Sequence, residues 1–232
     1  MIESYFNYIK EGNLEKFLSI IEKIGTELLD DWGNSALQQA AYYNQKDLLN
    51  LLLGHGATLD PKSLTTACSM GYTEVAILLI HNKVDVNYQD AHGMSPLMWA
   101  ARKNATLVCT LLDAGANVIL KDKNGTTAMM HACNAEIVEI LIKQGLDLEE
   151  KNKYDQSAIN LAASYGETKA IEGYLAHGAV LNSLDQYHNT PLINASIGGY
   201  EEAVKLLLSK KADTSIKNKY DRTALGEALL RK

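Results

Sequence analysis

Two kinds of side chain in this 232-residue sequence could take part in chemistry: recurring carboxylates, and a few imidazoles and thiols. Two carboxylates brought together can act as general acid and base, and the recurring ones are Asp30, Asp90, Asp122 and Asp185. His131 lies two residues before Cys133, and imidazole and thiolate are common zinc ligands. A metal site there would need further ligands from elsewhere in the chain. The sequence contains no GxGxxG, Walker-type, HExxH or GxSxG motif, so we expect no enzyme activity.

The carboxylates recur because the sequence is built from a repeat. Six segments of eight residues share one motif. An Asp or Asn stands at its first position, a turn residue at the fourth, a Ser or Thr at the sixth and an apolar anchor at the eighth. With a seventh, degenerate copy, the anchors are Leu37, Leu64, Leu97, Met129, Ile159, Leu192 and Leu225. They lie 27, 33, 32, 30, 33 and 33 residues apart, and a period near 33 indicates stacked structural repeats. The carboxylates are therefore expected to shape turns.

Each copy combines a hairpin turn with the start of a helix. The Asp or Asn opens the turn with its side chain. Three positions later stands a residue type that tolerates a positive φ, at Gly33, Gly93, Gly125, Asp155, His188 and Asp221. The Ser or Thr that follows is predicted to cap a helix, at Ser35, Ser95, Thr127, Ser157, Thr190 and Thr223.

Two helices are predicted after each hairpin. The first carries small residues such as Ala40-Ala41, and the second is apolar at helical spacing and ends at a glycine such as Gly56. Two copies are shortened. The interval from Gly56 to Leu64 is six residues shorter than usual, and the copy anchored by Met129 lacks three residues between its helices. We expect a local irregularity at both places.

The motifs resemble those of the ankyrin-repeat family. Asn-Thr-Pro-Leu192 and Gly-Met-Ser-Pro-Leu97 are similar to its Gly-x-Thr-Pro-Leu signature, and Leu-Leu-Asp-Ala-Gly-Ala116 is similar to the end of its second helix. The resemblance covers essentially the whole chain. It implies one all-α solenoid domain, 1–232, of about eight helix-turn-helix units with short hairpin loops. These would be an amino-terminal cap at 1–29, then 30–59, 60–89, 90–121, 122–151, 152–184, 185–217, and a truncated last unit at 218–232.

One departure from the family signature affects its buried hydrogen bonds. The His that usually follows the Pro-Leu pair is absent, and its place is taken by Gln38, Met98, Met130, Asn160, Ile193 and Gly226. The network that this His usually makes is therefore not expected in its usual form.

Composition narrows the classes of partner. The chain has 22 Lys and Arg against 28 Asp and Glu, a formal charge of −6, which argues against nucleic acid or an anionic membrane. No secretory signal and no 18-residue apolar run is present. Three cysteines without a CxxC pair fit a reducing compartment. We expect a monomer without cofactor or metal, in the cytoplasm, or in a host cytoplasm if the protein is an effector.

The resemblance also implies where a partner would bind. Hairpin tips and the outward face of the first helices line a concave groove in this family. The residues predicted to bind the partner are Trp32, Tyr42, Tyr43, Met70, His92, Arg102, Lys103, Tyr154, Tyr165, Tyr187 and Tyr220. Tyr and Trp are enriched at binding hot spots. The alternative is that the tip tyrosines pack on the next hairpin. Trp99, in contrast, is expected in the core.

These observations predict non-catalytic protein–protein recognition through the groove. Two narrower versions remain open: a bacterial or parasite protein that engages a host factor or neutralises a toxin, and a eukaryote-type cytoplasmic adaptor. A function of a different class is also open, in which the chain is the substrate-recruiting portion of a longer enzyme.

Overall fold

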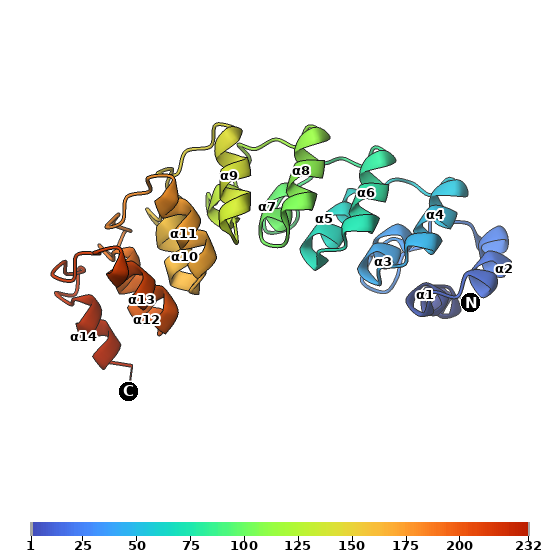
Figure 1. Ribbon diagram of the computed structural model, residues 1–232. Helices are drawn as coiled ribbons and strands as arrows, with labels where there is room; N and C mark the ends of the chain where they lie inside the picture. The colour runs from blue at the N-terminus through green and yellow to red at the C-terminus, as the bar shows by residue number, and fades with distance from the viewer. Residues whose placement is uncertain (1, 232) are drawn as a thin grey trace. The chain divides into compact units, whose positions relative to one another are not determined.

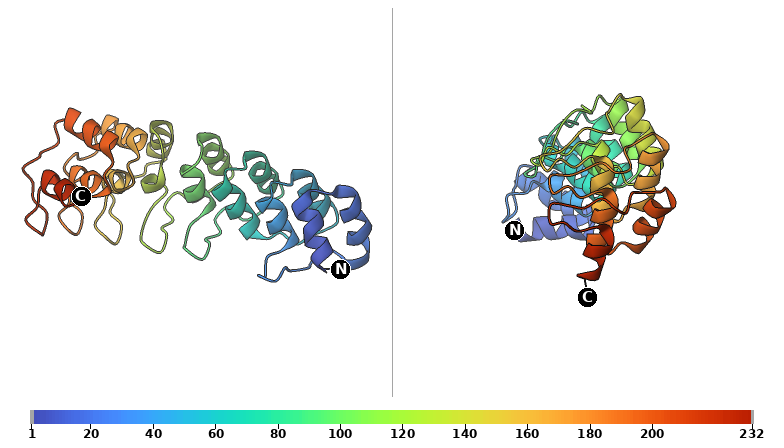
Figure 2. Two further views of the ribbon diagram at one scale, coloured as in Figure 1. Left: turned by 90° about the horizontal axis from the view of Figure 1, so that it is seen from below. Right: turned by 90° about the vertical axis from the view of Figure 1, so that its left-hand side faces the viewer.

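The computed structural model describes residues 2–231, and within that range all regular structure is helical apart from one isolated bridge between Leu29 and Ser35 (Figure 1). The chain forms two compact units, Met1–Asn117 and Val118–Lys232, which we call the amino-terminal and carboxy-terminal units. In each unit, hairpins project from one side of the helix pairs (Figure 2). The helix-turn-helix fold predicted from the repeat is confirmed.

The amino-terminal unit consists of four antiparallel helix pairs. They are α1 (Ile2–Glu11) with α2 (Leu14–Ile24), α3 (Ala36–Tyr42) with α4 (Lys46–Gly54), α5 (Pro61–Met70) with α6 (Thr73–His81), and α7 (Pro96–Ala101) with α8 (Ala105–Asp113). Each first helix packs on the first helix of the next pair, and α4, α6 and α8 pack on one another in the same order. This nearest-neighbour stacking is the pattern of a repeat protein.

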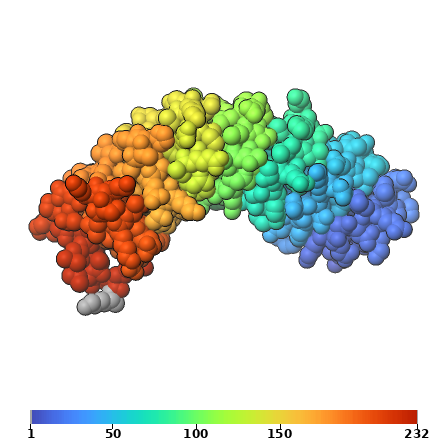
Figure 3. Space-filling view, viewed as in Figure 1, coloured from blue at the N-terminus to red at the C-terminus, as the bar shows by residue number. Residues whose placement is uncertain are grey.

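The carboxy-terminal unit repeats the arrangement with a shortened start and a single last helix. Its elements are the 3₁₀ turn η1 (Met129–His131), α9 (Ala135–Lys143), α10 (Ala158–Tyr165), α11 (Thr168–Ala176), α12 (Pro191–Gly198), α13 (Glu201–Ser209) and α14 (Ala224–Leu229). Side chains fill the space between successive helix pairs of this unit (Figure 3). Six of the seven anchors are at most 2% exposed, whereas Leu225 on α14 is 69% exposed.

The local predictions hold at most hairpins. Asp155, His188 and Asp221 have φ of 54°, 59° and 60°, so they replace the glycines as expected. Ser35, Ser95, Thr190 and Thr223 accept a hydrogen bond from the backbone N–H three residues later. Ser157 is also the N-cap residue of its helix. The hairpin and the following helix are therefore specified by the same short motif.

The copy anchored by Met129 departs from the prediction. We expected a first α-helix capped by Thr127, but residues 129–131 form only a 3₁₀ turn, and the Thr127 hydroxyl has no partner among the described residues. The three missing residues leave too little chain for a full helix before α9 begins at Ala135. Tyr174 of α11 fills the space, and its hydroxyl donates to the carbonyl of Met129 at 2.6 Å.

The residue that replaces the family His is apolar in some copies and polar in others. Met98 and Ile193 are apolar residues and are buried. Asn160, in contrast, is fully buried and polar: its Oδ1 accepts from the hydroxyls of Ser157 and Ser183, and its Nδ2 donates to the Ser183 carbonyl at 2.9 Å. Asn160 thus links one repeat to the hairpin of the next, as a satisfied buried polar group.

Candidate partner-binding surface

The hairpins have a common internal bonding pattern that holds each tip. The first Asp or Asn accepts, through Oδ1, the backbone N–H groups two and four residues later, at 2.7–3.2 Å in all six copies. The nearer donor is the tip residue itself: Trp32, His92, Asn124, Tyr154, Tyr187 or Tyr220. Because its backbone is fixed in this turn, the tip side chain projects from a rigid support.

In four of the six copies, a second hydrogen bond joins the hairpin to its own first helix, nine residues along the chain. Asp90 accepts from the Trp99 indole, Asp185 accepts from Asn194 at 3.2 Å, and Asp30 accepts from the Gln39 amide. In the last copy the direction is reversed, because Asn218 donates to Glu227 at 2.8 Å. His131 and Asp122 approach to 3.7 Å, which is too long for a hydrogen bond. The carboxylates thus orient hairpins, as the repeat predicted.

Large side chains at most of the predicted positions are exposed. Trp32 is 84% exposed, Tyr220 61% and Tyr165 62%, and the other positions are exposed too, at Tyr42, Met70, His92, Arg102, Lys103, Tyr154 and Tyr187. Tyr43 is half-buried and stacks edge-on against Tyr42, with ring centroids 5.0 Å apart. Seven of the eleven predicted residues belong to the amino-terminal unit and four to the carboxy-terminal unit.

In the carboxy-terminal unit the hairpins are joined edge to edge by backbone hydrogen bonds. The carbonyls of Asn124, Tyr154 and Tyr187 accept from the N–H groups of Lys153, Gln186 and Lys219, at 2.9–3.0 Å. The Tyr154 hydroxyl also reaches the Asn124 side chain, at 3.4 Å. Packing on a neighbouring hairpin thus accounts for part of the Tyr154 surface, yet 44% of that residue stays exposed.

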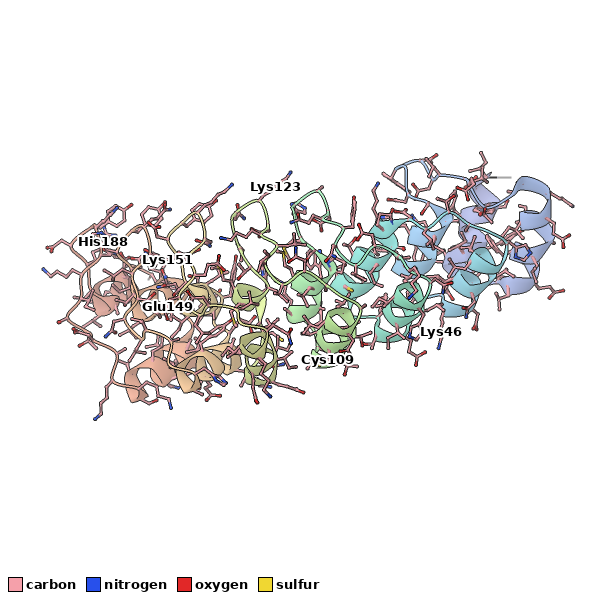
Figure 4. All side chains as sticks on the ribbon, turned by 90° about the horizontal axis from the view of Figure 1, so that it is seen from above. Lys46, Cys109, Lys123, Glu149, Lys151 and His188 are labelled. Atoms are coloured by element: carbon pink, nitrogen blue, oxygen red, sulfur yellow. The ribbon has the colours of Figure 1, made fainter. Side chains whose placement is uncertain are left out.

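Lysines flank these same tips. Lys151 and Lys153 donate to the backbone carbonyls of Leu184 and Lys123, so their charges are not neutralised by a carboxylate in those contacts. Lys121, in contrast, pairs with Glu150 at 2.6 Å. Lys123, Lys151 and His188 lie on the hairpin side of the unit (Figure 4). The hairpin edge therefore combines tyrosine rings with cationic groups.

The amino-terminal unit contains a pocket that the sequence interpretation missed. Residues 57–60 form no hairpin: α5 begins at Pro61 and is capped directly by Asp60. The uncovered face of α5 forms one wall of a pocket of about 300 Å³, lined by Gln38, Lys62, Thr65, Thr66, Ser69, Tyr88, Asp90, Ala91 and Trp99. The six-residue shortening was the signal in the sequence, but what it uncovers depends on the neighbouring repeats.

Trp99 is half-buried at this pocket, so the prediction that it packs in the core is wrong. The hydrogen bond from its indole N–H to Asp90 explains the difference, because it draws the ring toward the hairpin.

The arrangement of the titratable side chains bears on whether they could bind a metal or act in catalysis. Among residues 2–231, no three His, Cys, Asp or Glu side chains converge as a metal site would require. Burial raises the pKa of the Cys68 thiol to about 12, so this thiol is no nucleophile near neutral pH. The helices of the described range are also too short or too polar to cross a bilayer.

The chain is similar in sequence and in fold to known proteins. The chain is 33% identical over 139 residues to human ankyrin repeat and SOCS box protein 6, covering 52% of this chain and 33% of the relative. It is 30% identical over 172 residues to an L-asparaginase of Dirofilaria immitis, covering 72% and 29%. It therefore spans about a third of each relative. The crystal structure of the human ASB11 ankyrin repeat domain superposes with a TM-score of 0.72 at 25% identity, covering 84% of this chain and 92% of that one.

The family model for ankyrin repeats in three copies matches in four overlapping stretches, residues 6–90, 60–122, 97–185 and 159–231. These matches extend over nearly the whole sequence and include both shortened copies. The chain belongs to the ankyrin-repeat family.

Proposed function

We propose that this chain binds a protein partner through its hairpin tips and the exposed ends of its first helices. Ankyrin repeats are in general protein–protein interaction modules, and the observation that carries the proposal is the exposure of aromatic side chains on a hydrogen-bonded backbone. Tyr154, Tyr187 and Tyr220 occupy corresponding tips of three joined hairpins and are 44–61% exposed. A preformed surface of this kind avoids much of the ordering cost of binding.

The chemistry of the partner follows from the charges beside the tyrosines. In the carboxy-terminal unit, Lys123 and Lys151 lie on the hairpin side (Figure 4), and Lys153 adjoins the tip residue Tyr154 in the sequence. The Arg222 guanidinium lies 5.9 Å from the centre of the Tyr220 ring. In the amino-terminal unit, Arg102 and Lys103 are both exposed at the end of α7. An acidic patch on the partner would complement either cluster of cations.

The test is affinity capture followed by mass spectrometry, with two triple variants. Changing Tyr154, Tyr187 and Tyr220 to Ala should abolish capture of a protein that the unmodified chain retains, with far-UV helicity and melting nearly unchanged. The matched control changes Glu139, Lys169 and Lys205 to Ala, three exposed residues on second helices, and should retain capture. If both triple variants capture the same proteins, the tips are not the binding surface. If the tyrosine variant unfolds, the tyrosines are structural.

A second candidate is that the chain is the recruiting portion of a longer enzyme. The favouring observation is that it spans only 29% of a relative named L-asparaginase. An effector, a toxin-neutralising protein and a cytoplasmic adaptor remain narrower versions of the first proposal. The mass of the protein isolated from its source separates the candidates, since a catalytic domain adds substantially to the 25.5 kDa of this sequence.

A further inference from the structure

The pocket beside Trp99 has a chemistry that the general binding surface lacks. It exists because one repeat has no hairpin, so the polar face of α5 lies open between α3 and the hairpin that precedes α7. Its volume of about 300 Å³ is at the small end of ligand pockets and suits a single large side chain. The pocket lies entirely within the amino-terminal unit.

Several polar groups of the lining offer acceptors, beside donors such as the Lys62 ammonium. The hydroxyls of Thr65 and Ser69 donate to backbone carbonyls on their own helix, each at 2.9 Å, and keep their lone pairs. The indole N–H of Trp99 is used by Asp90. Oε1 of Gln38 is buried and has no hydrogen-bond partner among the described residues. A buried acceptor left without a donor costs free energy, and a donor supplied by a ligand would recover it.

The Asp90 carboxylate and the Trp99 ring both favour a cationic ligand with N–H donors. Asp90 Oδ2 accepts the indole N–H and has a second lone pair for another donor. The Trp99 ring is held in place by that bond and presents an aromatic surface to the pocket. Lys62 is the cation among the lining residues, and it is exposed at the rim. The unit as a whole is acidic, since residues 1–117 contain 13 Asp and Glu against 8 Lys and Arg.

We propose that this pocket is a subsite for an arginine side chain presented by a partner protein. A guanidinium has five N–H donors and no acceptor, and its plane stacks on aromatic rings. It would donate to Asp90 while lying against Trp99, and to Gln38 once that side chain turns its buried amide oxygen toward the pocket. An apolar side chain would leave Gln38 unpaired, and a carboxylate would be repelled by Asp90. The inference rests on the proposed function for the source of the arginine, but the pocket can be tested without the partner.

The test uses the two tryptophan indole N–H signals in the NMR spectrum of the ¹⁵N-labelled protein. The probes are blocked pentapeptides, Gly-Gly-Xaa-Gly-Gly, with arginine, lysine or citrulline in the middle, at millimolar concentration because one side chain binds weakly. The arginine peptide should shift the Trp99 signal in a saturable way, while the signal of Trp32, on an exposed hairpin tip, stays in place. Citrulline has nearly the same shape without the charge and should shift it at least several-fold less.

Two variants give opposite expected effects, so a folding defect cannot imitate the result. Gln38→Leu removes the unpaired acceptor and should weaken arginine binding several-fold. Lys62→Ala removes the cation at the rim and should strengthen it. Equal shifts from all three peptides, a parallel shift of Trp32, or no response to either variant would overturn the arginine subsite. These outcomes leave the proposed function intact, because that proposal depends on the tyrosine variants in the other unit.

Discussion

Trp99 donates its indole N–H to Oδ2 of Asp90 at 2.9 Å, from the helix to the hairpin of the same repeat. In three other copies, the residue nine positions after the hairpin Asp or Asn also forms a hydrogen bond with it. Where the helix residue donates, as with Gln39 and Asn194, the hairpin residue is Asp. Where it is the acceptor Glu227, the hairpin residue is Asn218. In these four copies the choice between Asp and Asn is therefore a choice of hydrogen-bond direction, in addition to the turn that both residues make.

Changing Asn218 to Asp tests this rule. The variant keeps the oxygen that holds the tip but places a second carboxylate against Glu227, 2.8 Å from Oε1 in the present structure. Arg222, 3.7 Å from the same oxygen, offsets part of the repulsion. We expect a loss of about 1–2 kcal/mol in the free energy of unfolding, measured by urea denaturation. Adding Glu227→Gln should restore most of it, because Gln can donate to the new carboxylate.

Asn152→Asp is the matched control for this change. Asn152 makes the same turn, but the residue nine positions later is Leu161, so no carboxylate faces it. Its amide instead donates to Gln156, whose side chain can turn to present a donor. We expect a change within about 0.5 kcal/mol. A loss equal to that of Asn218→Asp would show that the turn, and not the partner nine residues on, decides the residue type.

Much of the fold could be predicted because its determinants are local. The positive φ at Asp155 and the caps at Ser35 and Thr190 depend on a few neighbouring residues, and the motif contains them all. The pocket, the half-buried Trp99 and the role of Asn160 could not be predicted in this way. They depend on what the next repeat places opposite each side chain, and the period alone does not say which atoms meet.

Tyr174→Phe tests how the shortened repeat is stabilised. The fully buried hydroxyl donates to the carbonyl of Met129 and lies 3.3 Å from the carbonyl of Ala132. Its removal takes a hydrogen-bond donor away from these buried carbonyl oxygens. We expect a loss of about 1–3 kcal/mol in the free energy of unfolding. Tyr165→Phe, at an exposed tyrosine of the same unit, is the control and should change it by less than about 0.5 kcal/mol. Equal effects would mean that the hydroxyl of Tyr174 is not needed.

Gly173→Ala probes the close approach of α11 to α9 in the same region. A Cβ at this position would lie 2.6 Å from the Cα of Ala135, a backbone atom that cannot move independently. We expect destabilisation of about 1–3 kcal/mol, measured by thermal or urea unfolding. Gly226→Ala, where the nearest atoms would be 3.7 Å away, serves as the control and should be tolerated. Similar stability of both variants would contradict the close packing of the two helices.

The cysteines should differ in their reactivity toward a thiol reagent. Cys109 is exposed on α8, on the side away from the hairpins, whereas Cys68 is fully buried and burial raises its pKa to about 12 (Figure 4). At pH 8 we expect fast labelling of Cys109 and labelling of Cys68 only after denaturation. Cys109→Ser should remove the fast phase. Cys133 is half-buried and should react more slowly than Cys109, so a fast phase that persists in this variant would contradict the partial burial of Cys133.

Acid unfolding should depend in part on Asp30. Burial favours a higher pKa for this carboxyl, but hydrogen bonds from Asn34, Trp32 and Gln39 outweigh burial and hold its pKa below the usual value. Because the folded pKa is lower than the unfolded one, the stabilising contribution is present above the unfolded pKa of about 3.9. It is lost as the pH falls through the folded pKa.

Asp30→Asn keeps an oxygen for the turn but cannot titrate. We therefore expect its melting temperature to be lower than that of the unmodified protein near pH 7, and the difference to shrink as the pH falls below about 4. Asp31→Asn removes the adjacent exposed carboxylate and controls for the change in net charge. A difference in melting temperature that stays constant from pH 7 to pH 3 would contradict this prediction. It would show that ionisation of the Asp30 carboxyl does not stabilise the hairpin, because the contribution of an ionised carboxylate must be lost in the acid range.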